Sequence, residues 1–317
     1  MGRRHRFYLQ LASDLGARTI IDLGCGTGML TRALTGPHRQ IIGVDPAPAM
    51  LAYAARQPGA ERVRWINGDA HLLGTLDADL VVMTGHVAQI FLEDTDWQAT
   101  LHAIHAAVRP GGHLAFESRN PEDRAWERWN RDATFTELDT PYGRVETWIE
   151  VHHVSDKRVR FAGYNRFCAT GELVVVPSEL RFRSLREIQE SLHTAGLTIT
   201  QVYSDWFRGP QTPTSRSIIC VAQRGATEGS ARAKEALCTP GSPPASPICS
   251  LMRRRPGGFG RRCAGTACRC CRRSGLLPRR TVCSSGWQRI WFLNTKSPHS
   301  HNQQNVAVAG ELPRRFV

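Results

Sequence analysis

The chain has 317 residues and a formal net charge of +13, with 41 Lys and Arg against 28 Asp and Glu. The excess lies at one end: residues 1–225 hold 25 basic and 25 acidic residues, so the remaining 16 basic and 3 acidic residues carry all of it. The global charge therefore predicts no basic nucleic-acid-binding face on the first 225 residues, and no apolar run reaches the roughly 18 residues of a membrane-spanning helix.

Cysteines are divided in the same way as the charge. Cys25, Cys168 and Cys220 come early, and the other seven of the ten follow residue 237. Three scattered cysteines indicate a reducing compartment. The basic amino terminus lacks the long apolar core of a signal peptide. We therefore expect a soluble, cytoplasmic protein.

The first predicted element is a short helix. Phe7, Leu11 and Leu15 recur at helical spacing, and Gly16 is a plausible end signal. This helix leads into the stretch from Thr19 to Met29, TIIDLGCGTGM, on which the rest of the interpretation depends.

That stretch predicts a buried strand, a glycine turn and a helix. Its apolar, β-branched start is typical of a buried strand, and the helix is expected from Met29 to Leu34. Between them lie Asp22 and then glycines at positions 24, 26 and 28, where the absence of side chains lets backbone N–H groups approach a ligand. The dinucleotide fingerprint G-x-G-x-x-G would need a glycine where Met29 stands.

The pattern D-x-G-x-G-x-G resembles the S-adenosylmethionine (SAM) motif of class I methyltransferases. The resemblance implies that Gly24, Cys25, Gly26 and Gly28 hold the amino-acid end of SAM. Asp22 would orient this turn or contact the methionine amino group. Cys25 is interpreted as a small residue that fills the loop and not as a nucleophile.

The second and third strands each end near an acid. The strand from Gln40 to Val44 is followed by Asp45, which can accept hydrogen bonds from both ribose hydroxyls or act as a helix N-cap before Pro46. In the helix expected from Ala47 to Arg56, Met50 is either an adenine cover or a core residue. Pro46 and Met50 are included in the predicted cofactor site.

The strand from Val63 to Ile66 is followed by Asp69 and Ala70. By resemblance, Asp69 accepts the adenine amino group. The alternative is a turn aspartate. Both residues join the predicted cofactor site.

The fourth strand, Asp79 to Met83, ends at Thr84, Gly85 and His86. Ligands of open α/β sheets bind at the carboxyl ends of the strands, so these are pocket candidates. Thr84 is assigned to the cofactor. His86 is a catalytic candidate that orients or deprotonates the acceptor, and the alternative is a loop histidine.

A helix from Trp97 to Val108 is expected next, ended by a turn at residues 109–112, with a fifth strand from His113 to Glu117. The sequence VRPGGHLAFES is similar to a frequent turn of SAM methyltransferases. Arg119 then suggests an anionic or carboxylate-bearing acceptor, or forms a surface salt bridge. His102 and His105 lack a third ligand, so no metal site is predicted.

An insertion is expected between about residues 121 and 184. Its runs alternate apolar and polar residues, as antiparallel strands with one solvated face do. Residues 155–158 and 169–172 are predicted hairpin turns. In this fold such a small sheet often forms a lid over the acceptor pocket.

The last expected elements are a helix from Leu185 to Ala195 and strands at Leu197 to Tyr203 and Ser217 to Ala222. The resemblance covers roughly residues 5–224. It implies an α/β, doubly wound, seven-stranded Rossmann-like methyltransferase sheet, closed by a final hairpin and carrying a small antiparallel β insertion. We therefore expect a methyltransferase domain over residues 1–224.

Residues 225–317 form a basic tail rich in Cys, Arg and Pro, without sustained periodicity, and are expected to be disordered. Its cysteine spacing, C-x4-C-x-C-C, is unlike that of zinc sites. Such a composition is also what a high-GC gene yields in a shifted reading frame.

The predicted activity is methyl transfer from SAM to a small-molecule acceptor by in-line displacement. One alternative is a nucleic-acid methyltransferase that uses the basic tail, although TGHVAQ after the fourth strand does not match the base-gripping motif of such enzymes. The other alternative is an inactive SAM-fold binding protein. Neither a membrane nor nucleic acid is an expected partner.

Overall fold

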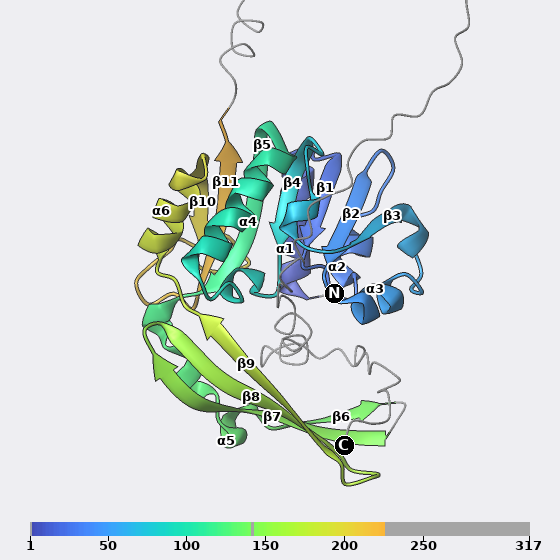
Figure 1. The fold of residues 1–317 in the computed structure, drawn as a ribbon, viewed down its shortest axis with the longest axis vertical. Coiled ribbons are helices and arrows are strands. Elements are labelled where there is room, and N and C mark those ends of the chain that lie inside the picture. The colour runs from blue at the N-terminus through green and yellow to red at the C-terminus, as the bar shows by residue number, and fades with distance from the viewer. Residues whose placement is uncertain (1, 141–142, 226–317) are drawn as a thin grey trace, which may run out of the picture. The chain divides into compact units, whose positions relative to one another are not determined.

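A computed structural model of the protein describes residues 2–140 and 143–225. Its main feature is a seven-stranded sheet with the order β10-β11-β5-β4-β1-β2-β3 (Figure 1). Neighbours among β1 to β5 are parallel, whereas β11 is antiparallel to β5 and β10 is antiparallel to β11. The predicted doubly wound sheet and its closing hairpin are confirmed. The strands are β1 Thr19–Leu23, β2 Gln40–Asp45, β3 Val63–Asn67, β4 Ala78–Met83, β5 Val108–Arg119, β10 Leu197–Tyr203 and β11 Ser217–Arg224.

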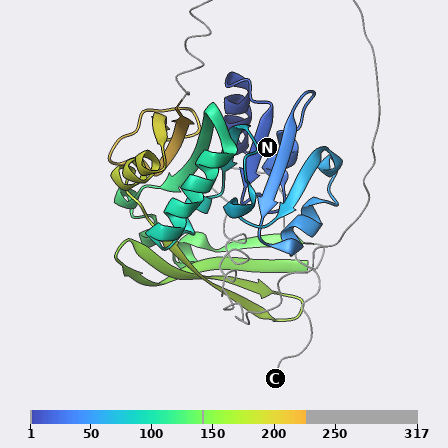
Figure 2. The ribbon, with the colours of Figure 1, turned by 45° about the horizontal axis from the view of Figure 1, so that its top comes forward.

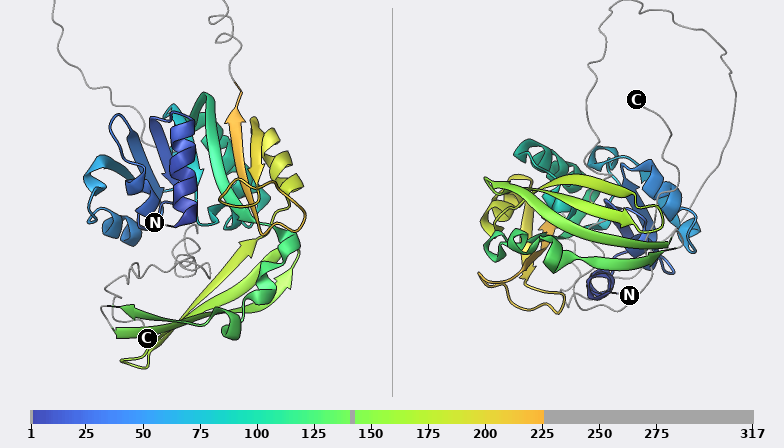
Figure 3. Two further views of the ribbon diagram at one scale, coloured as in Figure 1. Left: turned by 180° about the vertical axis from the view of Figure 1, so that it is seen from behind. Right: turned by 90° about the horizontal axis from the view of Figure 1, so that it is seen from below.

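Helices cover both faces of this sheet, because its central strands are apolar on both sides. Ile20 and Val82 pack in one core cluster, while their chain neighbours Ile21 and Val81 pack in another. Figure 1 shows α4 in front of the sheet, and Figure 3 shows α1 on the reverse face. The helices are α1 Arg3–Asp14, α2 Met29–Ala33, α3 Pro48–Ala54, α4 Asp94–Ala107, α5 Arg131–Thr134 and α6 Leu185–Thr194, with 3₁₀ turns at Ala60–Arg62, Ala70–Leu72, Val87–Gln89, Pro121–Asp123 and Ala125–Arg128.

The start of β5 differs from the prediction. We expected a turn at residues 109–112 and a strand from His113, but the strand already begins at Val108. Ala78 pairs with Val108 and Leu80 with His113, so residues 109–112 bulge out opposite Asp79. The Arg109 guanidinium fixes this bulge by an ion pair to Asp79 at 2.6 Å. The four residues predicted as a turn are therefore a bulge inside a longer strand.

The predicted β insertion is a second, four-stranded antiparallel sheet with the order β6-β7-β8-β9. Asp156 and Lys157, both with positive φ, form the two-residue turn between β7 and β8, as a tight hairpin requires. Phe161, Leu180 and Phe182 form its small core, against which Trp126 and Trp129 pack. The strands are β6 Thr136–Thr140, β7 Gly143–Ser155, β8 Arg158–Phe167 and β9 Leu173–Arg181.

Ion pairs attach this second sheet to the segment that follows β4. Arg181 and Arg183 each lie 3.0 Å from a different carboxylate oxygen of Asp94, the first residue of α4. Arg158 lies 3.0 Å from Glu93. Figures 1 and 2 show the second sheet on the side where the parallel strands of the first sheet end. Its role as a lid stays a prediction.

The expectations for the basic tail concern residues outside the described part of the chain, apart from Gly225. Within the described part, every helix is too short or too polar to traverse a lipid bilayer.

Candidate functional site

The glycine turn after β1 is held by the end of β2. Gly24, Gly26 and Gly28 all have positive φ, at 75°, 56° and 68°, which explains why glycine occupies these positions. The N–H groups of Gly24 and Cys25 donate to the carbonyl oxygen of Val44 at 2.8 and 3.1 Å. The turn is thereby fixed before any ligand arrives.

Asp45 supports the same turn from the end of β2. Its Oδ2 accepts the N–H of Gly26 at 2.8 Å, and its Oδ1 accepts the N–H of Ala47 at 2.9 Å. The carboxylate is only 6% exposed, and burial raises its pKa although both N–H groups oppose that rise. The alternative that Asp45 caps the next helix is wrong, because α3 begins at Pro48 with Ala47 as its N-cap residue.

Asp22 is a buried acid with one carboxylate oxygen that lacks a hydrogen-bond partner in the described chain. It is 1% exposed, and its Oδ2 accepts the Thr31 hydroxyl at 2.7 Å. Its Oδ1 is buried without a hydrogen-bond partner among the described residues. Burial raises the pKa of Asp22 to about 7, with a further contribution from the nearby Asp45 charge. An unpartnered buried carboxylate oxygen fits a cationic group such as an ammonium.

Gly28 and Cys25 have packing roles as well as their places in the motif. A Cβ at Gly28 would lie 2.3 Å from Cη2 of Trp65, a β3 residue that the sequence analysis did not single out. Burial raises the pKa of the Cys25 thiol. Cys25 therefore stays protonated and unreactive, as its interpretation as a loop-filling residue predicts.

The remaining predicted cofactor residues follow the strand ends. Asp69 accepts the N–H of His71 at 2.9 Å and so caps the 3₁₀ turn that starts at Ala70. Pro46 and Met50 are half-buried after β2. Thr84, also half-buried, directly follows β4. Parallel strands place all of these at one edge of the sheet, and their contact with a cofactor stays a prediction.

Glu117 in β5 is a central residue that sequence reasoning missed. It is fully buried and accepts the Tyr8 hydroxyl and the N–H groups of Gly85, at 2.6 Å, and His86, at 3.4 Å. The Arg4 guanidinium lies 3.7 Å away. The sequence contained one sign of this role, since Glu117 directly follows the apolar residues Leu114, Ala115 and Phe116 of a predicted buried strand.

His86 and Arg119 lie at adjacent strand ends. His86 Nδ1 is buried without a partner in the described chain, and burial together with the Arg119 and Arg4 charges holds the pKa of His86 well below its usual range. The imidazole is therefore neutral. Arg119 Nη1 donates to Oε1 of Gln89 at 2.9 Å, and its guanidinium lies 5.0 Å from the Trp129 ring centre. The alternative of a surface salt bridge is not seen for Arg119 within residues 2–140 and 143–225.

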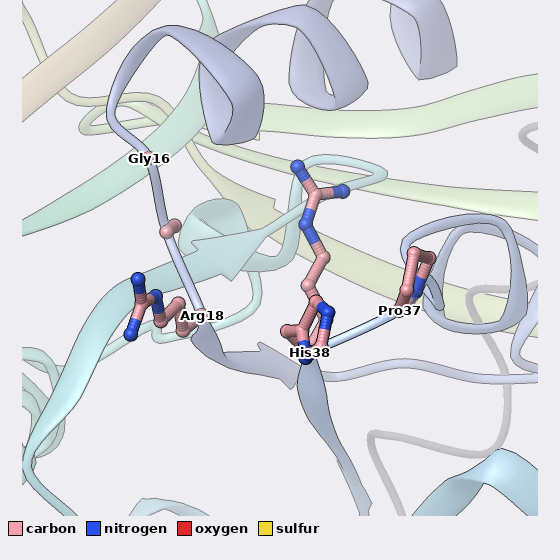
Figure 4. Close-up of a pocket in the computed structure, with 6 residues that line it drawn as sticks. Gly16, Arg18, Pro37 and His38 are labelled. Carbon is pink, nitrogen blue, oxygen red and sulfur yellow. The ribbon is translucent and has the colours of Figure 1, made fainter.

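A cavity of about 500 Å³ lies at the opposite end of the sheet, before β1 and β2 (Figure 4). It is lined by Gly16, Ala17, Arg18, Pro37, His38 and Arg39 and contains none of the predicted site residues. Because ligands of such sheets bind at carboxyl ends, this cavity is not the candidate site.

In the described chain, no three His, Cys, Asp or Glu residues gather as a metal site would require.

Known proteins resemble both the sequence and the fold. Residues 20–112 match the family model described as a methyltransferase domain. The cypemycin N-terminal methyltransferase of a Streptomyces species is 27% identical over 217 residues, covering 66% of this chain and 84% of its own length. Two further curated relatives are matched over 58% and 62% of their own length.

Solved structures share the architecture at low identity. A SAM-dependent methyltransferase from Clostridium acetobutylicum gives a TM-score of 0.60 at 17% identity, over 71% of this chain and 92% of that one. A SAM-bound amino pentose methyltransferase from Micromonospora echinaspora gives 0.53 at 23%, over the same shares of 71% and 92%. The family match identifies residues 20–112 as part of a methyltransferase domain, and the glycine turn and strand order give the described chain the fold of the class I SAM-dependent methyltransferases.

Proposed function

We propose that this enzyme methylates a small-molecule acceptor, and that the acceptor atom is an amine nitrogen. The relatives named above include an N-terminal methyltransferase and an amino pentose methyltransferase, which supports this class of acceptor. The observation that carries methyl transfer from SAM is the pair of buried aspartates, Asp22 and Asp45, on either side of a glycine turn. The cytoplasm remains the proposed compartment, supported by the free thiols of Cys25, Cys168 and Cys220.

The residues around the turn suit the separate parts of SAM. Asp45 uses one lone pair of each oxygen on a backbone N–H, so each oxygen retains acceptor capacity for a ribose hydroxyl. Asp22 offers its unpartnered Oδ1 to the methionine ammonium. Asp69 and Met50 are proposed to hold adenine. When bound, SAM supplies a methyl group on a positively charged sulfur, whose departure leaves a neutral thioether.

His86 is proposed as the group that takes the acceptor proton. An amine nitrogen that gains a bond to carbon becomes cationic and must release a proton. One ring nitrogen of the neutral imidazole carries a lone pair that can take this proton, and the lowered pKa of His86 keeps the ring unprotonated before the transfer. Proximity and orientation are the main requirement, because the leaving group is already activated.

Calorimetric titration of SAM and its demethylated product tests the cofactor site. Asp45→Ala should weaken both affinities about tenfold or more, because charge-assisted hydrogen bonds to the ribose are lost. Asp79→Ala is the matched control: Asp79 also accepts two backbone N–H groups, from Arg18 and Thr19, but at the amino end of β4. Equal affinities for wild type and Asp45→Ala would remove Asp45 from the site.

A further inference from the structure

Arg119 is a half-buried cation that forms no ion pair with an acid of the described chain. Its Nη1 donates to the neutral amide oxygen of Gln89, and its guanidinium carbon lies over the Trp129 ring, 5.0 Å from the ring centre. The other guanidinium nitrogens make no hydrogen bond to described residues. Burial lowers the pKa of Arg119 to about 10, so the group is still charged at neutral pH.

Arg183, which is 4% exposed, provides a comparison with Arg119. The Arg183 guanidinium also lies over a tryptophan ring, 5.4 Å from the centre of Trp97. Unlike Arg119, it has a carboxylate at 3.0 Å, from Asp94. A half-buried arginine without a carboxylate partner loses part of its hydration and gains no ion pair in return, which favours a functional reason for its position.

The nearest acid is already engaged. Glu117 accepts the Tyr8 hydroxyl and two backbone N–H groups, and its ion pair is with Arg4. Gln89, 1% exposed, is fixed in turn because its amide nitrogen donates to the carbonyl oxygen of Arg181 at 3.3 Å. The Arg119 guanidinium is thus positioned by the neutral side chains of Gln89 and Trp129, and its charge remains available for an anionic ligand.

Its position is at the acceptor end of the site. Arg119 is the last residue of β5 and His86 follows β4, the neighbouring strand. His86 is the N-cap residue of the 3₁₀ turn that carries Gln89, the hydrogen-bond partner of Arg119. Trp129 comes from the insertion, so the guanidinium lies between the strand ends and the second sheet.

We propose that Arg119 binds a carboxylate of the acceptor, so that the methylated molecule is an amino acid or another amino-carboxylate and not a neutral amine. A guanidinium binds a carboxylate through two parallel hydrogen bonds, which its unengaged nitrogens can supply. The Trp129 ring lies beside the guanidinium. This rests on the proposed methyl transfer for the identity of the site, but the carboxylate contact itself is measured by binding.

Benzoate and benzamide are the probes, because they share shape and differ in charge. Both are titrated by calorimetry into protein saturated with the demethylated product of SAM. Wild type should bind benzoate at least tenfold more tightly than benzamide, and Arg119→Met should lose this preference. Arg131→Met is the matched control, since the Arg131 guanidinium lies over the Trp148 ring of the second sheet, 4.9 Å from its centre, and Arg131 has no hydrogen bond to Arg119 or Gln89 in the described chain.

Three results would overturn the proposal. The first is equal or undetectable binding of the two probes by wild type. The second is a benzoate preference that survives in Arg119→Met. The third is a loss of product affinity in Arg119→Met, which would mean that Arg119 holds the carboxylate of SAM itself. Failure of wild type to bind SAM at all would instead refute the proposed function.

Two measurements keep the test decisive if Arg119→Met does not fold. Arg119→Lys retains the charge but not the planar fork, so it should keep a weakened benzoate preference. In wild type, raising the salt concentration should weaken benzoate binding and leave benzamide binding unchanged. A salt-independent benzoate affinity contradicts a charge-based contact.

Discussion

At the scale of single residues, burial gives Asp22 and Asp45 their chemistry. Both lie at strand ends within a parallel sheet, where water is excluded and the charged form of a carboxyl is disfavoured. Asp45 is compensated by two backbone N–H groups, whereas Asp22 has only the Thr31 hydroxyl. This difference is why we propose Asp22, and not Asp45, as the acid that binds a cationic group of the ligand.

Asp22 should make the stability of the protein depend on pH. Its folded-state pKa of about 7 lies above the usual value of an unfolded aspartate, so folding favours the protonated form. The stabilisation is complete below about pH 4 and is lost as the pH rises through about 7. The free energy of unfolding of Asp22→Asn relative to wild type should therefore increase from pH 5 to 7 by up to about 1.4 kcal/mol per pH unit, as measured by urea unfolding.

Asp79→Asn is the control for that series. Burial alone would raise the pKa of Asp79, but the Thr19 N–H, Arg109 and the Arg18 N–H lower it overall. Asp79 is therefore ionised in both states above pH 5, and its difference from wild type should stay flat from pH 5 to 8. Parallel profiles for the two variants would contradict the account of Asp22.

At the scale of elements, Trp65 of β3 packs against the glycine turn and restricts which residues it can contain. Trp65 packs over Gly28 and also over Gly43 of β2, where an added Cβ would lie 2.7 Å from the ring. The indole nitrogen donates to the Ala60 carbonyl at 3.2 Å, so the ring is fixed. Part of the glycine pattern is therefore a packing requirement between neighbouring elements.

Gly28→Ala should destabilise the protein by more than about 2 kcal/mol, from overpacking in addition to positive φ. Gly16→Ala is the matched control, because Gly16 has a similar φ of 58° but nothing within 4 Å of its would-be Cβ. The control should lose only about 1 kcal/mol. Thermal unfolding of both variants measures the difference, and equal losses would show that Trp65 does not constrain the turn.

Helix α1 is joined to the centre of the sheet by one buried hydrogen bond. The Tyr8 hydroxyl donates to Glu117, and burial raises the pKa of Tyr8, with the nearby Glu117 charge contributing. Tyr8→Phe should cost about 1–3 kcal/mol, because a buried carboxylate loses a donor. Tyr203→Phe, whose hydroxyl bonds to Gln201 at the surface, should be nearly neutral in the same urea unfolding experiment. Similar costs would contradict this role for Tyr8.

At the scale of the whole molecule, residues 2–140 and 143–225 contain a complete seven-stranded sheet with core clusters on both faces. A second sheet is attached through Arg158, Arg181 and Arg183 to the segment after β4. The last strand, β11, ends at Arg224, which donates to the carbonyl oxygens of His105 and Val108 at 2.8 and 2.7 Å. These contacts fix the end of β11 within the described part of the chain.

A protein shortened to end at Arg224 should therefore keep its melting temperature within a few degrees and its affinity for the demethylated product of SAM within about twofold. Differential scanning calorimetry and isothermal titration of the full-length and shortened proteins make the comparison. A large loss of either quantity would show that residues 225–317 are integral to the domain.

The sequence by itself determined the sheet, the SAM motif and the positions of Asp22, Asp45, Asp69 and Thr84, because local patterns specify strands, turns and strand ends. It also located the insertion and its hairpin turns. Such patterns depend on neighbouring residues along the chain, which is why they can be recognised without a structure.

Only the tertiary structure decided which charges are satisfied. The carboxylate of Glu117 meets Tyr8 from a helix more than 100 residues away, Trp65 closes over Gly28, and Arg119 meets Trp129 while no described acid pairs with it. The bulge at residues 109–112 likewise depends on Asp79 of the adjacent strand. These features arise from contacts between segments distant in sequence, whose energies depend on burial and on partners that no local pattern contains.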